Sequence, residues 1–208
     1  MEDTNLDQEY NYDEISKRNA GVKHTNAILA YLHDLVFLIA GVLLVFSLLF
    51  RVVVVSGPSM NQTLVDGDWL ILLGNVIYRN PEHGDIIVAS KSSYDNGTPI
   101  IKRVIAVEGQ TVDIDFEAGI VYVDGVALDE PYTLTGTNRY EGVDFPLTVS
   151  AGCLFVMGDN RNDSKDSRDP EIGLIDRREV LGKAIFLLVP GNNKGNEQRE
   201  FNRIGALS

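Results

Sequence analysis

A chain of 208 residues that is 44% hydrophobic is long enough for one domain of ordinary size plus an appendage, and this composition excludes a disordered protein. The formal net charge of −12 and the lack of a Lys/Arg cluster exclude the usual electrostatic surface of a nucleic-acid-binding protein. The single cysteine, Cys153, excludes an internal disulfide and has no Cys or His neighbours at metal-ligand spacing. We therefore expect no nucleic-acid partner, no cofactor and no metal site.

An apolar segment near the N-terminus predicts a membrane anchor. Sixteen residues from Leu35 to Phe50 carry no charge, which as a helix gives about 24 Å, short of the roughly 30 Å hydrocarbon core. Apolar residues on both sides extend the segment, so we place a transmembrane helix at residues 27–51. A buried core helix is the alternative, but a chain of this size rarely hides a helix that is apolar on every face. A cleaved signal peptide is disfavoured, because mostly acidic residues precede the segment instead of a short basic lead.

The charges on either side of this segment predict its orientation. Residues 1–26 form a polar tail that is acidic at first and then carries Lys17, Arg18 and Lys23, whereas no basic residue follows Arg51 until position 79. By the positive-inside rule we expect a single-pass protein of the cell membrane, with its N-terminus in the cytoplasm and the rest of the chain outside. The lipid bilayer is then one of its partners.

The stretch from residue 52 to residue 190 is expected to be β-structure, because short apolar or alternating runs are separated by Gly, Asp and Asn turns. The predicted strands are Trp69–Leu73, Ile86–Ala89, Ile100–Val107, Thr111–Phe116, Ile120–Val123, Leu154–Met157 and Ala184–Val189. Asp124 and Gly125 predict a tight hairpin turn, and residues 133–148 are polar enough to form a looped insertion. Residues 191–208 are polar and are predicted to form a loose tail.

Ser59 is a candidate nucleophile. It lies in the turn formed by residues 56–60 (SGPSM), directly after the β-branched run Val52–Val55. Gly and Pro hold such a turn, so the serine hydroxyl is free to leave the backbone. Most serines in Gly/Pro turns are solvated loop residues, so the assignment needs a base nearby.

The choice of base lies between one histidine and one lysine. Of the three histidines, His24 and His33 precede or border the anchor, which leaves His83 in a polar loop as the single candidate for a Ser-His-Asp triad. Lys102 lies in the apolar run Ile100–Val107, where burial can lower the pKa of the amine enough to populate its neutral form. Strand alternation places Lys102 and Arg103 on opposite faces, and a lysine on a solvated sheet face is the alternative.

Residues 157–168 (MGDNRNDSKDSR) form a third unusual stretch, which is dense in hydrogen-bonding side chains. Such a composition is typical of a loop that braces a site through side-chain and backbone bonds. An exposed turn, or a calcium loop built on Asp and Asn oxygens, remains open from composition alone.

These three blocks follow the anchor in an order that resembles type I signal peptidases, the membrane-anchored Ser/Lys proteases that release exported proteins from their signal peptides. The resemblance covers residues 31–190, and it implies a mainly β fold: one transmembrane helix and an exported catalytic domain of antiparallel β-sheets at 52–190. A smaller β-subdomain is then inserted at roughly residues 108–152.

The resemblance also implies a role for each site residue. Ser59 is the nucleophile, Lys102 the general base, and Ser164 a hydrogen-bond partner of the lysine amine. The bracing network consists of Asp159, Arg161, Asp166 and Arg168. The shallow pockets for small substrate residues are lined by Val55, Met60, Leu64 and Ile101, which implies preproteins with Ala-x-Ala-type sites as substrates.

Two positions depart from the family pattern. The Ser59 amide should supply one oxyanion donor, but Gly57 stands where many relatives have a serine that supplies a second. Gln62 stands where the family usually has proline, which should loosen the loop without removing a reacting group.

Two other functions are compatible with a Ser/Lys pair or with this fold. A self-cleaving Ser/Lys repressor is disfavoured because the N-terminal region shows no DNA-binding unit. A non-enzymatic accessory protein of the same fold, which assists surface-fibre assembly, is disfavoured because Ser59 and Lys102 are both present. We therefore expect a monomeric signal peptidase.

Overall fold

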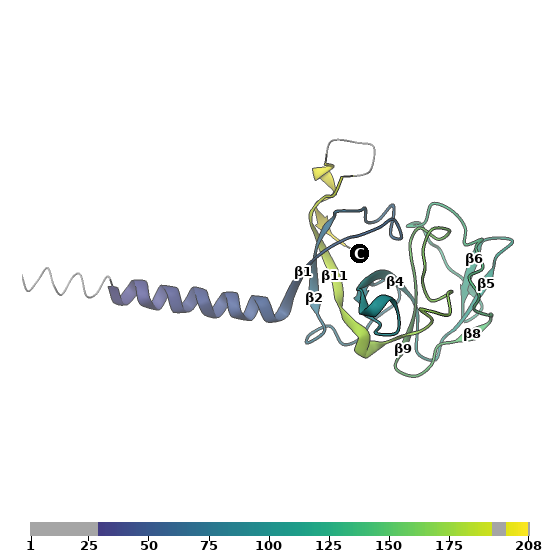
Figure 1. The fold of residues 1–208 in the computed structure, drawn as a ribbon, viewed down its shortest axis with the longest axis horizontal. Coiled ribbons are helices and arrows are strands. Elements are labelled where there is room, and N and C mark those ends of the chain that lie inside the picture. The colour runs from purple at the N-terminus through teal and green to yellow at the C-terminus, as the bar shows by residue number, and fades with distance from the viewer. Residues whose placement is uncertain (1–28, 193–198, 208) are drawn as a thin grey trace, which may run out of the picture. The chain divides into compact units, whose positions relative to one another are not determined.

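The computed structural model describes residues 29–192 and 199–207, and the chain divides into two units, one up to Ser47 and one from Leu48 onward. The units are shown in Figure 1. The predicted cytoplasmic tail, residues 1–26, lies outside the described residues, and so do the three basic residues on which the predicted orientation depends.

A single long helix, Leu29–Leu49, occupies the predicted anchor region. It has 21 residues, and its most apolar window of 18 residues has a mean hydropathy of 2.4 and contains no buried residue. At 1.5 Å per residue it is about 31 Å long, which matches the hydrocarbon core of a bilayer. The helix ends two residues before the predicted boundary at residue 51. The reason is that Arg51 already belongs to a strand, where the β-branched valines that follow it pair with a neighbour.

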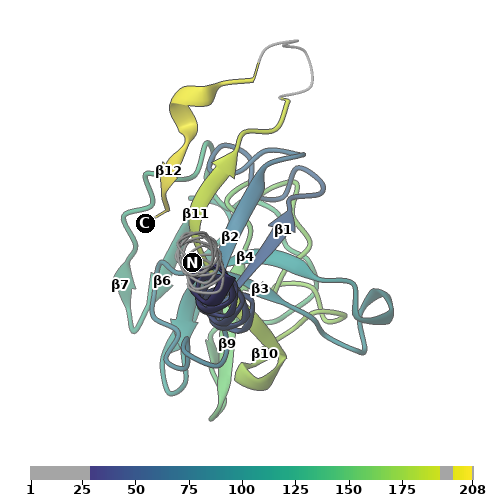
Figure 2. The ribbon, with the colours of Figure 1, turned by 90° about the vertical axis from the view of Figure 1, so that its left-hand side faces the viewer.

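The second unit is built around an eight-stranded sheet in which every pairing is antiparallel. The strands lie in the order β1 (Phe50–Val54), β2 (Trp69–Gly74), β11 (Val180–Val189), β3 (Ile86–Ala89), β4 (Ile100–Val107), β9 (Cys153–Met157) and β10 (Ile175–Asp176), and β12 (Gly205–Ala206) pairs with β11. Figure 2 shows β1, β2 and β11 side by side. The late strand β11 therefore sits in the middle of the sheet, between β2 and β3.

A second, four-stranded antiparallel sheet is formed by the chain between β4 and β9. Its order is β7 (Val126–Ala127), β6 (Ile120–Val123), β5 (Thr111–Asp115) and β8 (Leu147–Thr148). Between β6 and β7, Asp124 and Gly125 have φ values of 52° and 78°, as a type I′ hairpin turn requires. The predicted hairpin is confirmed, and the predicted fold class, mainly antiparallel β with one apolar N-terminal helix, is confirmed as well.

Three clusters of buried apolar side chains hold the two sheets and the loops together. One cluster, under β1, β2 and β11, takes in Val55, Met60 and Leu64 from the segment that follows β1. A second cluster joins β4 and β9 to the smaller sheet, with Ile105 and Phe155 among its members. The segment around Ser59 is thus anchored in a core.

Three single-turn 3₁₀ helices complete the described elements: η1 (Asp95–Gly97), η2 (Arg177–Glu179) and η3 (Phe201–Arg203). For the described residues 199–207, η3 and β12 correct the prediction of a loose tail, because Gly205 and Ala206 pair with β11 of the large sheet.

Candidate active site

The nucleophile candidate Ser59 lies in a loop whose two ends are tied together. Val55 N donates to Asp68 O at 2.8 Å, and Gly67 N donates to Val55 O at 2.9 Å. Within the loop, Gly57 has a φ of 89°, a conformation that disfavours other residues, and its N–H donates to Asp66 Oδ1 at 2.9 Å. The loop is therefore closed at its base and stiffened before the serine.

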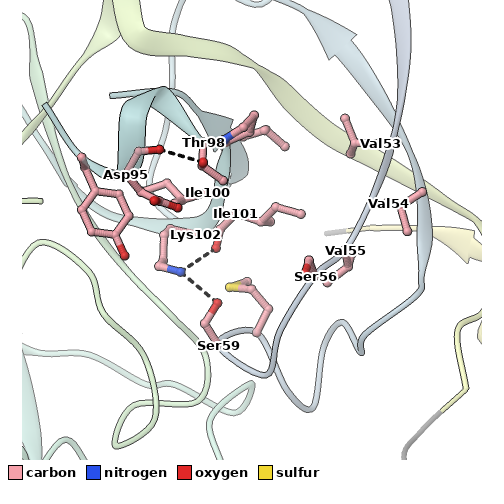
Figure 3. Close-up of a pocket in the computed structure, with 14 residues that line it drawn as sticks. Val53, Val54, Val55, Ser56, Ser59, Asp95, Thr98, Ile100, Ile101 and Lys102 are labelled. Atoms are coloured by element: carbon pink, nitrogen blue, oxygen red, sulfur yellow. Dashed lines mark hydrogen bonds between the residues drawn. The ribbon is translucent and has the colours of Figure 1, made fainter. Parts of the chain in front are cut away.

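Lys102 meets Ser59 from strand β4. A 2.8 Å hydrogen bond joins Lys102 Nζ to Ser59 Oγ, and the amine also donates to Ile101 O at 3.1 Å. Figure 3 shows both bonds. Lys102 is only 5% exposed, so the alternative of a lysine on a solvated sheet face is wrong. The structure thus brings together the two residues proposed as nucleophile and base.

Burial is also the main influence on the lysine amine. Removal from water lowers the pKa of Lys102 to about 8, against the opposing attraction of the Asp166, Glu141 and Asp159 carboxylates. The Arg168 guanidinium lowers the pKa of Lys102 further. No carboxylate bonds the amine directly among the described residues, so a substantial neutral fraction is available near neutral pH.

His83 takes no part in this pair. Its Nδ1 lies 2.8 Å from Ile105 O, and in the described part of the chain no hydrogen bond links its ring to Ser59. A Ser-His-Asp arrangement around Ser59 is therefore absent from residues 29–192 and 199–207.

The stretch beginning at Gly158 packs directly against the nucleophile's backbone. Asn160 N donates to Ser59 O at 3.0 Å, and Asn160 Nδ2 donates to Pro58 O at 3.2 Å. A Cβ atom on Gly158 would stand 2.4 Å from Ser59 O and 2.2 Å from Ser164 Oγ. Only glycine fits at this position.

Asp159 forms a buried ion pair with Arg103, the neighbour of Lys102. Arg103 Nε donates to Asp159 Oδ1 at 2.9 Å and Nη2 donates to Oδ2 at 2.8 Å, the two-point geometry that makes such pairs strong. The Thr63 hydroxyl also donates to Asp159 Oδ2. Asp159 thereby connects strand β4 to the loop that carries Ser59.

Asp166 holds the other side of the bracing loop. It pairs with Arg168 at 2.8 Å, and its Oδ2 accepts hydrogen bonds from Gly158 N and Ser164 Oγ, both at 2.9 Å. Ser164 therefore bonds to Asp166, and in the described residues it is not a partner of the Lys102 amine as the resemblance implied. The carboxylate attracts the serine proton more strongly than a neutral amine can.

Arg161 reaches out to the inserted subdomain. Its guanidinium donates to both oxygens of Glu130, at 2.7 and 2.5 Å, and to Thr137 Oγ1 at 2.9 Å. The four side chains of the bracing network, Asp159, Arg161, Asp166 and Arg168, are thus all buried and paired, so this part of the loop is not an exposed turn. No group of three or more His, Cys, Asp or Glu in the described ranges is placed to hold a metal ion.

Sequence reasoning missed several of these partners. Arg103 had a signal, since it adjoins Lys102 in an apolar strand. Glu130, Thr137 and Thr63 had none, because the contacts join residues far apart in the sequence. Glu141, a buried carboxylate in the predicted looped insertion, was also missed.

A cleft of about 530 Å³ runs past the Ser59/Lys102 pair. Residues 53–56 line it on one side and residues 98–102 on the other, as Figure 3 shows. Val55, Met60 and Ile101 lie in its wall as predicted, but Leu64 does not. Leu64 is fully buried in the core, because a turn in which its N–H bonds Met60 O points its side chain inward.

The Ser59 N–H lies beside this cleft and donates to no atom of the described residues. It is thus available to a ligand, whereas the Gly57 N–H is already bonded to Asp66.

Comparisons with known proteins point to one family. A family model described as "Signal peptidase, peptidase S26" matches residues 28–189. The signal peptidase I of Bacillus licheniformis is 33% identical over 175 residues, which cover 80% of this chain and 91% of that protein. A probable signal peptidase I-1 of Synechocystis is 38% identical over 167 residues, covering 74% and 81%. A crystal structure of a signal peptidase I from Enterococcus faecalis matches with 33% identity and a TM-score of 0.41, over 50% of this chain and 96% of that one.

Proposed function

The chain belongs to the signal peptidase family, peptidase S26, and from this premise we propose that it removes signal peptides from preproteins with a Ser59/Lys102 dyad. The observation that carries the proposal is the 2.8 Å contact between Ser59 Oγ and the buried Lys102 amine. The accessory role is not favoured, because such a protein has no need of this contact.

In the proposed reaction the neutral Lys102 amine accepts the proton of the Ser59 hydroxyl as Oγ attacks the carbonyl carbon of the scissile bond. The Ser59 N–H stabilises the oxyanion that forms. The lysine ammonium then gives its proton to the departing amine, which leaves an acyl-enzyme on Ser59. In the second half Lys102 accepts a proton from water, the resulting hydroxide attacks the ester, and Ser59 recovers its proton.

The position of Lys102 accounts for the supply of neutral amine. An amine with an ordinary pKa of about 10.4 is neutral in only about 0.4% of molecules at pH 8. With the pKa lowered to about 8, half of the molecules hold the neutral form at that pH. The difference corresponds to roughly 3 kcal/mol, which the fold supplies by burying the amine.

The cleft favours an extended substrate with small side chains. A peptide laid between residues 53–55 and residues 100–102 runs alongside strand backbone, as in β-augmentation. The walls near the dyad are formed by Val55, Met60 and Ile101, and the first two are 4% and 1% exposed, so they have little room to recede. We therefore propose Ala-x-Ala-type sites, with small residues at the first and third positions before the cut.

The helix Leu29–Leu49 is proposed to anchor the enzyme in the membrane as a single span, with the N-terminus in the cytoplasm and the β-domain outside. Protease added outside intact protoplasts should digest the domain after Val55 and spare the N-terminal tail. Protection of the β-domain would overturn this orientation.

The dyad is tested by incubating the detergent-solubilised protein with a preprotein. Ser59→Ala and Lys102→Arg should be folded but inactive, since a guanidinium stays protonated and cannot act as a base. His83→Ala should keep turnover near that of the unmodified enzyme. An inactive His83→Ala beside an active Lys102→Arg would replace the dyad with a histidine-based site.

A further inference from the structure

Arg203 lies in η3, beyond residue 189 where the family match ends, and yet it contacts the loop that carries Ser59. Its Nη1 donates to Asp68 Oδ1 at 3.0 Å and its Nη2 donates to Asp68 Oδ2 at 2.6 Å. Nη2 also donates to Thr63 O at 3.2 Å. One guanidinium thus holds a side chain and a main-chain carbonyl of the same loop.

Asp68 is the residue that closes this loop. Its carboxylate is fully buried and accepts hydrogen bonds from Val65 N at 2.8 Å and Gly191 N at 2.6 Å, while its carbonyl accepts from Val55 N. Within the described ranges, Arg203 is the cation that pairs with Asp68. Removing one partner of a buried pair leaves an uncompensated charge, so Asp68 depends on Arg203 to stay in place.

Arg203 is itself fixed by the docking of the segment that follows it. β12 pairs with β11 through Phe186↔Ala206 and Leu187↔Gly205. Leu207 N donates to Ile185 O at 3.0 Å, and the Leu207 side chain packs on the cluster that includes Met60 and Leu64. The pairing of β12 with β11 and the packing of Leu207 therefore fix the position of the Arg203 guanidinium.

Thr63 is held from two directions. Arg203 bonds its carbonyl, and Asp159, paired with Arg103 on the Lys102 strand, accepts its hydroxyl. We propose that Arg203 is a positioning residue that, opposite the Arg103–Asp159 pair, keeps the Ser59 turn in register with Lys102. The inference rests on the dyad proposed above. Arg203 does not line the cleft, so it acts through Asp68 and Thr63 and does not touch the substrate.

The test compares kcat and KM of the full-length protein in detergent on a preprotein. Misplacing a reacting group by about 1 Å costs on the order of 100-fold in rate. Arg203→Ala should therefore lower kcat about 100-fold, counted per folded molecule, with KM changed by less than about twofold. The kcat of Arg203→Lys should lie between those of Arg203→Ala and the unmodified enzyme. An ammonium keeps the charge, but it lacks the planar guanidinium geometry that bonds Asp68 and Thr63 together. Arg199→Ala, in the same segment but exposed, is the matched control and should match the unmodified enzyme.

A pH profile separates positioning from simple loss of stability. The groups whose charges act on Lys102 are Asp166, Glu141, Arg168 and Asp159, and none of them changes in these variants. A displaced Ser59 turn lets water reach the amine, so the acid limb of activity in Arg203→Ala should move to higher pH. Partial unfolding alone would lower the amplitude and leave the limb where it is.

The kinetics of these variants distinguish a failure of the Arg203 inference from a failure of the Ser59/Lys102 dyad. If Arg203→Ala does not fold, Arg203→Lys carries the test, and a normal kcat in that variant overturns the inference. The inference is also overturned if folded Arg203→Ala has an unchanged kcat, or if its loss of kcat/KM comes from a higher KM alone. Failure of the dyad itself is recognised separately, because Ser59→Ala or Lys102→Arg would then remain active.

Discussion

Gly158 approaches Ser59 so closely that a methyl group on it would stand 2.4 Å from the serine's carbonyl oxygen. That atom belongs to the backbone of the nucleophile, so the clash cannot be relieved by rotating a side chain. We expect Gly158→Ala to lose about 1–3 kcal/mol of stability and at least 100-fold in kcat, because Ser59 must shift away from Lys102. Gly205→Ala is the control, since a Cβ there meets nothing within 4 Å. Kinetics and thermal unfolding of both variants check this, and a fully active Gly158→Ala would contradict the close contact.

The Lys102 amine should set the acid limb of the pH profile. Because burial lowers its pKa to about 8, kcat/KM should rise about tenfold per pH unit below pH 8 and level off above it. The measurement is kcat/KM on a soluble peptide substrate between pH 5 and pH 10. A limb near pH 6.5 that disappears in His83→Ala would assign the base to the histidine.

The same burial should make Lys102 a destabilising residue at neutral pH. The pKa is about 8 in the folded state and 10.5 in the unfolded chain, so the unfolded state binds more protons between these values and stability rises with pH across that window. Lys102→Met should therefore be more stable than the unmodified protein below pH 8, by about 3 kcal/mol at most. The difference should shrink as the pH passes 10. Urea unfolding at pH 7 and pH 10 measures it, and equal stabilities at pH 7 would show that the amine is better solvated than the structure indicates.

Glu141 should hold the pKa of Lys102 higher than burial alone would. Its side chain is 3% exposed and its Oε1 lies 3.5 Å from Arg139 Nε, an ion pair without a hydrogen bond to either carboxylate oxygen. Burial raises the pKa of Glu141 against the attraction of Arg168 and Arg139. Its negative charge favours the lysine ammonium, so Glu141→Gln should lower the pKa of Lys102 and move the acid limb to lower pH. Asp144→Asn, an exposed change in the same loop, should leave the limb in place. A shift to higher pH in Glu141→Gln would contradict the sign.

The cleft walls should discriminate against bulk before the cut. A preprotein with Phe at the position before the scissile bond should be cleaved at least tenfold more slowly than one with Ala, because Met60 and Val55 are packed in the core. Ile101→Ala removes wall volume without removing a reacting group and should recover part of the loss. Cleavage of both preproteins at equal rates would show that these residues do not form the pocket.

Where the pattern was local, the sequence predicted the fold closely. β3, β4 and β6 have the predicted bounds, because apolar runs there are limited by Gly, Asp or Pro turns. β1 was not among the predicted strands, and its first two residues, Phe50 and Arg51, were placed in the predicted anchor because Phe50 continues the apolar run without a break. β11 begins at Val180, four residues before the predicted Ala184, because Gly182 and Lys183 interrupt the apolar pattern.

The candidate site, too, could be predicted where the signal lay in a local stretch of sequence. Ser59 and Lys102 could be named from their blocks, and the structure brings them together. The partner of Ser164 could not, because the choice between a lysine amine and the Asp166 carboxylate depends on how a loop folds back on itself. Arg203 lay in a polar stretch with no periodicity, and its role becomes visible only when β12 is seen beside β11.

The place of β11 in the large sheet has a consequence for when activity can begin. Ser59 lies in the connection between β1 and β2, and Lys102 lies in β4, which pairs with β3. β11 is the strand that joins the β1–β2 half of the sheet to the β3–β4 half. β11 is also made more than seventy residues after Lys102. Until β11 has been synthesised, the half that holds Ser59 and the half that holds Lys102 share no strand. A chain that ends before β11 therefore lacks the strand that joins the two halves of the sheet, and we expect such a chain to show no peptidase activity.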